Sequence, residues 1–142
     1  MPSLLYGHSA EVVQWVADQV PHMDAPEKGA GIGIVANGHL IAGVVFHEYR
    51  PDYGTIEMSM AATSPIWARR EIIGGFLSYP FHQLGVFKVF THTPIDNERA
   101  LKVNKHAGFK QEAVLAHQFG RGRHGVVCRM LQPDYQRIYE HG

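Results

Sequence analysis

The first part of the chain contains apolar residues at the spacing of a helix. Between Ser9 and Val20 the apolar side chains recur every three or four residues, Ser9 is a candidate N-cap, and Pro21 ends the run. Residues 22–31 then combine a proline with two glycines, which is typical of a loop. We therefore expect a helix over residues 9–20 and a loop after it.

A tight hairpin is the next predicted feature. Asn37-Gly38 lies between the apolar runs 32–36 and 40–46, and this dipeptide favours a two-residue turn between antiparallel strands. Residues 54–62 alternate apolar side chains with polar ones. They predict a third strand that pairs with the hairpin and has one apolar and one polar face.

A long helix and a strand are predicted for the middle of the chain. Ser64-Pro65 fits the start of a helix, because proline is favoured at the first helical position, and the helix is expected to run to about Leu84. Residues 87–93 predict the strand that follows. A strand, helix, strand unit of this kind implies a parallel pair of strands inside a mixed sheet.

Two closing strands are predicted at residues 109–119 and 125–131, joined by a turn rich in glycine and arginine. Residues 132–142 form a C-terminal tail whose apolar side chains predict either a short helix or a contact with a partner. The sequence contains no internal repeat or linker. The pattern therefore predicts a single α/β domain over residues 1–142, in which helices flank a mixed central sheet.

Composition narrows the classes of function. Hydrophobic residues make up 45% of the 142 residues, and 13 basic side chains balance 13 acidic ones, which disfavours a nucleic-acid partner. The single Cys128 cannot form an internal disulfide, and no apolar run reaches the ~18 residues of a membrane span. We expect a cytoplasmic protein without a membrane partner. The ten histidines match no metal-binding motif, so no metal site is predicted.

The segment Asn97–Phe109 carries the most functional information. Asp96 or Asn97 can cap a helix, a narrow face of small residues follows, and Gly108 can take the left-handed conformation that ends it. An ordinary surface helix closed by a glycine turn explains this spacing equally well. The segment resembles the helix and following strand of the GNAT N-acyltransferases, in which an asparagine opens a helix that lines the coenzyme A cleft.

The resemblance spans roughly residues 9–131 and is closest to the branch that includes the ribosomal-protein N-terminal acetyltransferases. It implies that two parallel strands splay apart and hold acetyl-CoA in the gap, with the pyrophosphate on the N-terminus of the helix between them. Helix N-termini bind anions because their first backbone amides lack partners. Family members carry glycine or alanine in this first turn, where the corresponding positions here are Pro65, Ala68 and Arg70.

Coenzyme contacts follow from the same resemblance. Arg69 and Arg70 are expected to bind phosphate in place of the missing glycines, and a basic first turn that lies in solvent is the alternative. Backbone amides near Met60 and Ala61 are candidates for polarising the thioester carbonyl. The complete set of expected coenzyme contacts is Met58, Met60, Ala61, Trp67, Ala68, Arg69, Arg70, Glu71, Asn97, Arg99 and Asn104.

Glu57 and Ser59, on the polar face of the third strand, are the candidate catalytic residues. An alkyl amine is mostly protonated at neutral pH, and Glu57 is a candidate base that removes the proton, directly or through water. The alternative for Glu57 is a solvent-facing strand carboxylate. Ser59 either binds the substrate or only fills the pleat. Asn104 stands where many family members have a tyrosine that protonates the leaving thiolate, yet a thiol with a pKa near ~8.5 leaves fairly well without help.

These expectations combine into one hypothesis about function. The resemblance implies an enzyme that moves an acetyl group from acetyl-CoA to a primary amine by direct attack, without a covalent enzyme intermediate. The amine belongs to a protein N-terminus or to a small molecule, and the family suggests a homodimer. The alternatives are a coenzyme A-binding module without activity and a protein-binding domain that takes no coenzyme.

Overall fold

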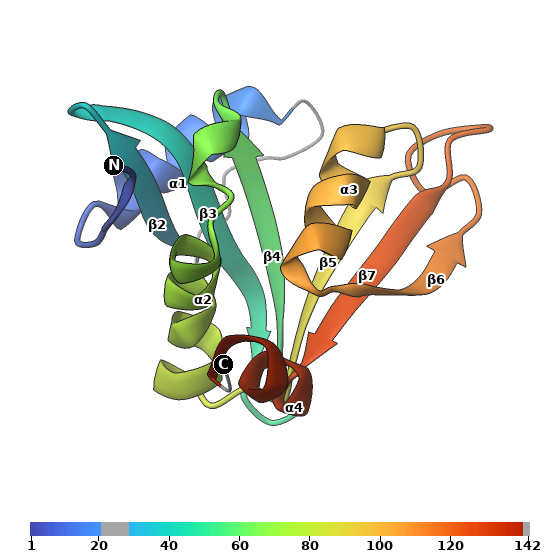
Figure 1. Ribbon diagram of the computed structural model, residues 1–142. Helices are drawn as coiled ribbons and strands as arrows, with labels where there is room; N and C mark the ends of the chain where they lie inside the picture. Colours follow the sequence, from blue (N-terminus) through green and yellow to red (C-terminus); the bar gives the residue numbers. More distant parts are fainter. Residues whose placement is uncertain (21–28, 141–142) are drawn as a thin grey trace.

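The computed structural model describes residues 1–20 and 29–140, and its centre is a seven-stranded sheet (Figure 1). The strand order is β1-β2-β3-β4-β5-β7-β6. Every neighbouring pair is antiparallel except β4 and β5, which are parallel. The predicted α/β class and mixed central sheet are confirmed.

The secondary-structure elements follow the predicted order with one addition, the short first strand. The strands are β1 (Ser3–Leu5), β2 (Ala30–Ala36), β3 (His39–Arg50), β4 (Thr55–Ala62), β5 (Lys88–Pro94), β6 (Lys110–Leu115) and β7 (Gly125–Leu131). The helices are α1 (Ser9–Gln19), α2 (Arg70–Ser78), α3 (Glu98–Ala107) and α4 (Gln132–Tyr135). Of the predicted loop, residues 22–28 lie outside the described part of the chain. No helix in the described ranges has the length and apolar character needed to cross a membrane.

The hairpin between β2 and β3 forms as predicted. Asn37 and Gly38 have φ angles of 54° and 78°, and positive values at both positions are what the tight two-residue turn requires. Strand β3 is longer than its apolar run and continues to Arg50. Its pairing with β4 is irregular between His47 and Arg50, and Glu48 adopts a φ of 55° within this interruption.

The single long helix predicted from Ser64 to Leu84 is wrong. A 3-10 turn at Pro65–Trp67 is followed by Arg69 in an extended conformation, and α2 begins only at Arg70. The Ser64 hydroxyl accepts a hydrogen bond from the Ile66 amide and so favours a separate short turn. Beyond α2 the chain widens into a π-helical turn, because Pro80 has no N–H to donate to the preceding turn.

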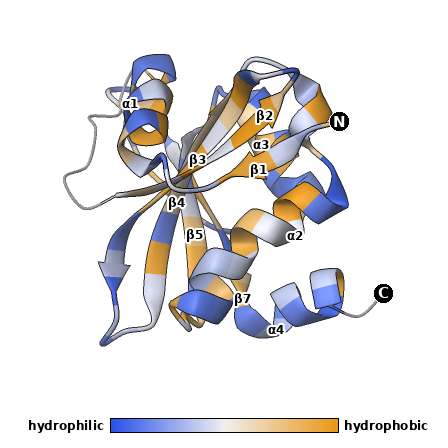
Figure 2. Cartoon of the chain, turned by 90° about the vertical axis from the view of Figure 1, so that its left-hand side faces the viewer, coloured by the Kyte–Doolittle hydropathy of each residue, from blue (hydrophilic) through white to orange (hydrophobic). Residues whose placement is uncertain are grey.

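Helices cover both faces of the sheet. Helix α1 lies on one face, and α2, α3 and α4 lie on the other (Figures 1 and 2). The larger core, on the α2 side, includes the fully buried Phe46 and Phe76. A smaller core joins Val12 and Val16 of α1 to Val45 of β3. The two cores hold the sheet between helical layers, which is the arrangement expected when each sheet face is apolar.

The C-terminal tail docks on its own chain, as a short helix and a π-helical turn at Gln136–Glu140. The Tyr135 hydroxyl donates to the Gly74 carbonyl of α2 at 3.2 Å, and the Tyr139 hydroxyl donates to the Ala107 carbonyl of α3 at 2.5 Å. The predicted short helix is therefore confirmed. Through these two bonds the tail connects α2 with α3.

Candidate active site

A cleft opens where β4 and β5 separate. The two strands pair over three rungs, from Thr55 with Lys88 to Glu57 with Phe90. Beyond these rungs β4 stays paired to β3 as far as Ala62, whereas β5 stays paired to β7 as far as Pro94. The strands therefore diverge like the arms of a V (Figure 1). The splayed parallel pair that the resemblance implied is present.

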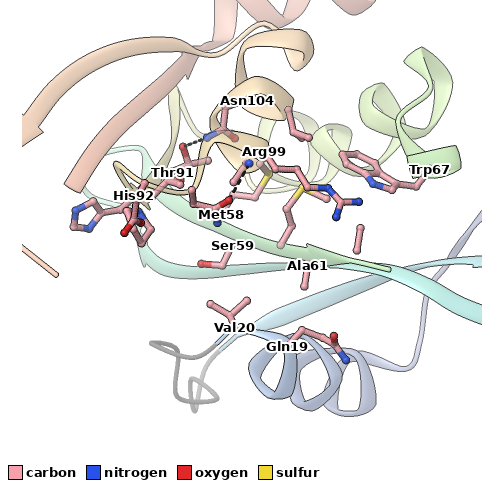
Figure 3. Close-up of a pocket in the computed structure, with 18 of the residues that line it drawn as sticks. Gln19, Val20, Met58, Ser59, Ala61, Trp67, Thr91, His92, Arg99 and Asn104 are labelled. Carbon is pink, nitrogen blue, oxygen red and sulfur yellow. Dashed lines mark hydrogen bonds between the residues drawn. The ribbon is translucent and has the colours of Figure 1, made fainter. Parts of the chain in front are cut away.

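The cleft has a volume of about 870 Å³ and reaches both faces of the sheet. Figure 3 shows Gln19 and Val20 on the α1 side and Trp67 and Asn104 on the other side. Side chains alternate along β4, so Ser59 faces α1 while Met58 belongs to the core on the α2 side. The lining residues are Gln19, Val20, Met58, Ser59, Met60, Ala61, Ala62, Pro65, Trp67, Thr91, His92, Thr93, Pro94, Asp96, Asn97, Arg99, Ala100, Val103, Asn104 and Arg123.

Helix α3 forms one wall of the cleft, and its ends are those predicted from the sequence. The Asn97 side chain accepts a hydrogen bond from the Ala100 amide at 3.2 Å and caps the first turn. Gly108, with a φ of 105°, ends the helix in the left-handed conformation. Ala100, Val103 and Asn104 from the face of small residues line the cleft. The narrow face seen in the sequence thus makes room for the cleft.

Asn104 is a buried polar residue in that wall. Its side-chain amide donates a hydrogen bond of 3.1 Å to the Thr91 hydroxyl of β5, and Asn104 is 6% exposed. Where the resemblance expects a tyrosine, this chain therefore has an amide that ties α3 to β5. Thr91 also hydrogen-bonds the Cys128 thiol. Burial raises the pKa of this thiol and keeps it protonated, and the hydrogen bond to Thr91 acts in the opposite direction.

We expect Asn104→Ala to lower the free energy of unfolding by about 1–3 kcal/mol, because it removes the buried hydrogen bond between the Asn104 amide and the Thr91 hydroxyl. Urea denaturation followed by circular dichroism measures this loss. Lys105→Ala, at the neighbouring exposed position, is the control and should change stability by less than about 0.5 kcal/mol. Equal losses in the two variants would contradict a structural role for the amide.

Glu57 lies next to the cleft but not in its lining. It occupies the last paired rung of β4 with β5, and its side chain is 21% exposed. Burial, and to a smaller extent the negative charge of Glu48, raise the pKa of Glu57 to about 7. A carboxyl group with such a pKa changes protonation state near neutrality, as a general base requires.

His47 connects Glu57 with the cleft. Its Nε2 lies 2.8 Å from the Ser59 Oγ and 3.8 Å from the Glu57 Oε2, and Ser59 lines the cleft. Burial lowers the pKa of His47, while the neighbouring Glu48 acts in the opposite direction. His47 could not be identified from the sequence, because it lies 12 positions before Ser59 on a different strand.

The residues predicted to hold the pyrophosphate are divided between two places. Trp67 lines the cleft and is 3% exposed, with its ring against Phe76. Ala68, Arg69, Arg70 and Glu71 do not belong to the lining. The Arg70 guanidinium instead donates to the Ile138 carbonyl and lies over the Tyr139 ring, so the tail engages it.

An ion pair lies at the rim of the cleft. Arg123 of the β6–β7 loop donates to both carboxylate oxygens of Asp96 at 2.8 and 3.0 Å, and this contact lowers the pKa of Asp96. The sequence marked this loop as basic without connecting it to the cleft. Among residues 1–20 and 29–140, no group of three or more His, Cys, Asp or Glu side chains is arranged to hold a metal ion.

Comparisons with known proteins find similarity in structure alone. No model of a protein family matches the sequence, and no curated protein matches it. A chain from a crystal structure of mutant forms of the spermidine/spermine N-acetyltransferase SpeG from Vibrio cholerae superposes with a TM-score of 0.77 at 17% identity, over 96% of this chain and 98% of that one.

Two further structures of the same enzyme agree. SpeG from Vibrio cholerae in complex with manganese ions gives a TM-score of 0.74 at 17% identity, over 96% of this chain and 95% of that one. A dodecameric spermidine N-acetyltransferase from Vibrio cholerae in an intermediate state gives 0.73 at 16% identity, over 99% and 98%. At these identities the likeness establishes the fold. The chain therefore has the fold of the GNAT N-acetyltransferases.

Proposed function

We propose that the protein is an N-acetyltransferase that moves the acetyl group of acetyl-CoA to the primary amine of a small molecule. The observation that carries this proposal is the cleft between the splayed β4 and β5, with a Glu57, His47 and Ser59 cluster on its α1 side. A cleft that reaches both faces of the sheet can admit the coenzyme from one face and the amine from the other.

The lining on the α2 side fits the coenzyme. The unpaired edges of β4 and β5 offer main-chain groups to the amides of pantetheine, and Asn97 lies at the α3 end of that wall. Arg99 lines the cleft and can pair with phosphate, for which a guanidinium is well suited. The backbone near Met60 and Ala61 is our candidate for polarising the carbonyl. The thioester supplies an activated acetyl group and a thiol that leaves.

Glu57 is the proposed proton acceptor for the amine. An ammonium group has no lone pair, so one proton must leave before nitrogen can attack the carbonyl carbon. In the reaction a C–N bond forms and the C–S bond breaks. The nitrogen then loses its second proton, and the leaving thiolate takes up a proton to become the free thiol of coenzyme A. Orientation in the cleft then supplies much of the rate, since no covalent enzyme intermediate is needed.

The structurally similar enzymes support a polyamine as the first acceptor to test, because they are named for spermidine and spermine. Acidic Glu48 and Glu57 near the α1 side of the cleft suit a cationic amine. The ribosomal-protein branch expected from the sequence would instead use a protein N-terminal amine. Both acceptor classes belong in one screen that follows release of the coenzyme A thiol.

We expect saturable binding of acetyl-CoA in calorimetry and a concentration-dependent rise in melting temperature, because a ligand of the folded state stabilises it. Arg99→Ala should weaken the binding of acetyl-CoA about 10-fold or more, because it removes one charge-assisted hydrogen bond to phosphate. Arg69→Ala removes a cation outside the cleft lining and is the matched control.

The outcomes separate the hypotheses. Equal weakening by Arg69→Ala would favour the pyrophosphate site expected at the start of α2. Binding without turnover on either acceptor class would support an inactive coenzyme A-binding module. No binding at millimolar ligand would support a protein-binding domain and end the enzyme proposal.

Location and assembly stay predictions. We expect a cytoplasmic protein, in which Cys128, the single cysteine of the sequence, stays a buried free thiol. A homodimer is expected in solution, and sedimentation velocity measures it directly.

A further inference from the structure

Two other side chains, His47 and Ser59, connect Glu57 with the lining of the cleft. Ser59 lines the cleft, whereas Glu57 and His47 do not. In the pairing of β3 with β4, His47 lies opposite Glu57, and Val45 lies opposite Ser59. The imidazole Nε2 approaches both oxygens, at 2.8 Å from Ser59 and 3.8 Å from Glu57. A proton that leaves the cleft toward Glu57 therefore has His47 and Ser59 on its route.

The surroundings of His47 favour one tautomer. Its Nδ1 lies 3.8 Å from the Glu48 Oε1, and a hydrogen bond of the ring to this carboxylate places the ring proton on Nδ1. Nε2 is then free to accept the hydrogen of the Ser59 hydroxyl. A Ser59 oxygen that donates to Nε2 keeps its lone pairs for an N–H of the bound ammonium group.

We propose that His47 is a positioning residue for acetyl transfer, which orients Ser59 and passes the amine proton from Ser59 toward Glu57. This inference rests on the function proposed above. The ammonium gives one proton to the Ser59 oxygen while the Ser59 hydroxyl gives its proton to the His47 Nε2. Serine is unchanged at the end, and the amine is neutral. The imidazolium then gives its Nε2 proton to the Glu57 carboxylate, the final acceptor, and the ring is neutral again.

The charged groups that face the His47 ring suit this transfer. They are Glu57 from β4 and Glu48 from β3 itself, and either carboxylate stabilises an imidazolium. The His47 side chain is 13% exposed, so water screens these contacts less than it would at the surface. Burial lowers the pKa of His47, which keeps the ring neutral and ready to accept before the substrate binds.

The test uses a variant that keeps the hydrogen bond but not the proton transfer. The His47→Gln amide oxygen can accept the Ser59 hydroxyl, yet it does not take up a proton near neutrality. We expect kcat to fall about 10²-fold, with acetyl-CoA binding in calorimetry unchanged. His39→Gln, at an exposed position of the same strand, is the control and should keep full activity.

Ser59→Ala supplies the second arm. If both residues act on one route, the His47→Gln/Ser59→Ala double variant should be no slower than the slower single variant. Independent, multiplying losses would overturn the inference. So would a kcat for His47→Gln within twofold of the unchanged protein.

A measurement without turnover separates this inference from the proposed function. We expect the ¹⁵N signals of the neutral His47 ring to show the proton on Nδ1 and a hydrogen-bonded, unprotonated Nε2, whose signal should shift in Ser59→Ala. A ring that carries its proton on Nε2, or an Nε2 signal that Ser59→Ala leaves unchanged, would overturn the route. The expected signals in a protein that acetylates no amine would instead mean that the proposed function has failed.

Discussion

Replacing Glu57 by Gln is expected to lower kcat/KM for the amine by about 10²–10⁴-fold, the usual contribution of a general base. The amide matches the carboxyl in size and accepts hydrogen bonds, so the cleft should keep its shape. Steady-state release of coenzyme A measures the effect. Glu11→Gln on the exposed face of α1 is the matched control and should leave kcat/KM unchanged.

The pH dependence gives this prediction a second readout. Burial raises the pKa of Glu57 to about 7, and only the ionised form accepts a proton, so kcat/KM should rise as the pH increases through about 7. In Glu57→Gln this inflection should vanish, and only the rise caused by deprotonation of the amine itself should remain. An inflection that persists in the variant would exclude Glu57 as the base.

The same carboxyl group should affect stability with the opposite trend. Its pKa rises from 4.5 to about 7 on folding, so the folded protein binds this proton more tightly than the unfolded chain does. The Glu57 contribution to the free energy of unfolding is therefore complete below pH 4.5 and decreases as the pH rises to about 7. Comparing the melting temperatures of the unchanged protein and Glu57→Gln across this range isolates that contribution.

Phe76→Ala is expected to lower the free energy of unfolding by about 3–5 kcal/mol. Phe76 is 1% exposed and lies in the core between α2 and the sheet, so its removal leaves a cavity that its neighbours cannot fill. This loss is a large part of the ~5–15 kcal/mol by which domains are stable. Because Phe76 supports the Trp67 ring, acetyl-CoA binding should weaken as well.

Urea denaturation measures that loss, and the slope of the unfolding free energy against urea concentration should be the same as in the unchanged protein. Phe87→Ala makes the same deletion at a side chain that is 54% exposed, and we expect a change below about 0.5 kcal/mol. If the two variants lost equal stability, the cost would not arise from the core under α2.

The parts of the fold that local signals specify could be predicted from the sequence. Asn37-Gly38 specified the hairpin turn, and Asn97 and Gly108 specified the ends of α3. Strand β1 was missed because three residues are too few to show an alternation. The break before α2 was missed because the helical spacing of apolar residues continues through it. The backbone of Arg69, however, is extended and interrupts the helix.

The candidate site was predictable only where one strand or one helix contains it. The alternation of β4 put Glu57 and Ser59 on one face, and the resemblance pointed to Asn97, Arg99 and Asn104 in the cleft wall. The position of His47 beside Glu57 depends on how β3 and β4 align, and the irregularity at Glu48 shifts that alignment. The ion pair of Arg123 forms because the β6–β7 loop folds back to Asp96. Contacts of this kind come from tertiary structure, which periodicity does not encode.

The docked tail has a consequence for how the cleft meets a ligand. Helix α2 packs beside β1, with Gly75 against Leu4, and α3 is hydrogen-bonded to β5. The hydrogen bonds of Tyr135 to α2 and of Tyr139 to α3 therefore connect the two arms of the V near its closed end. The spacing of the arms is then fixed before any ligand arrives. Association need not spend conformational entropy on closing the protein, so more of the contact energy with the coenzyme is left as affinity.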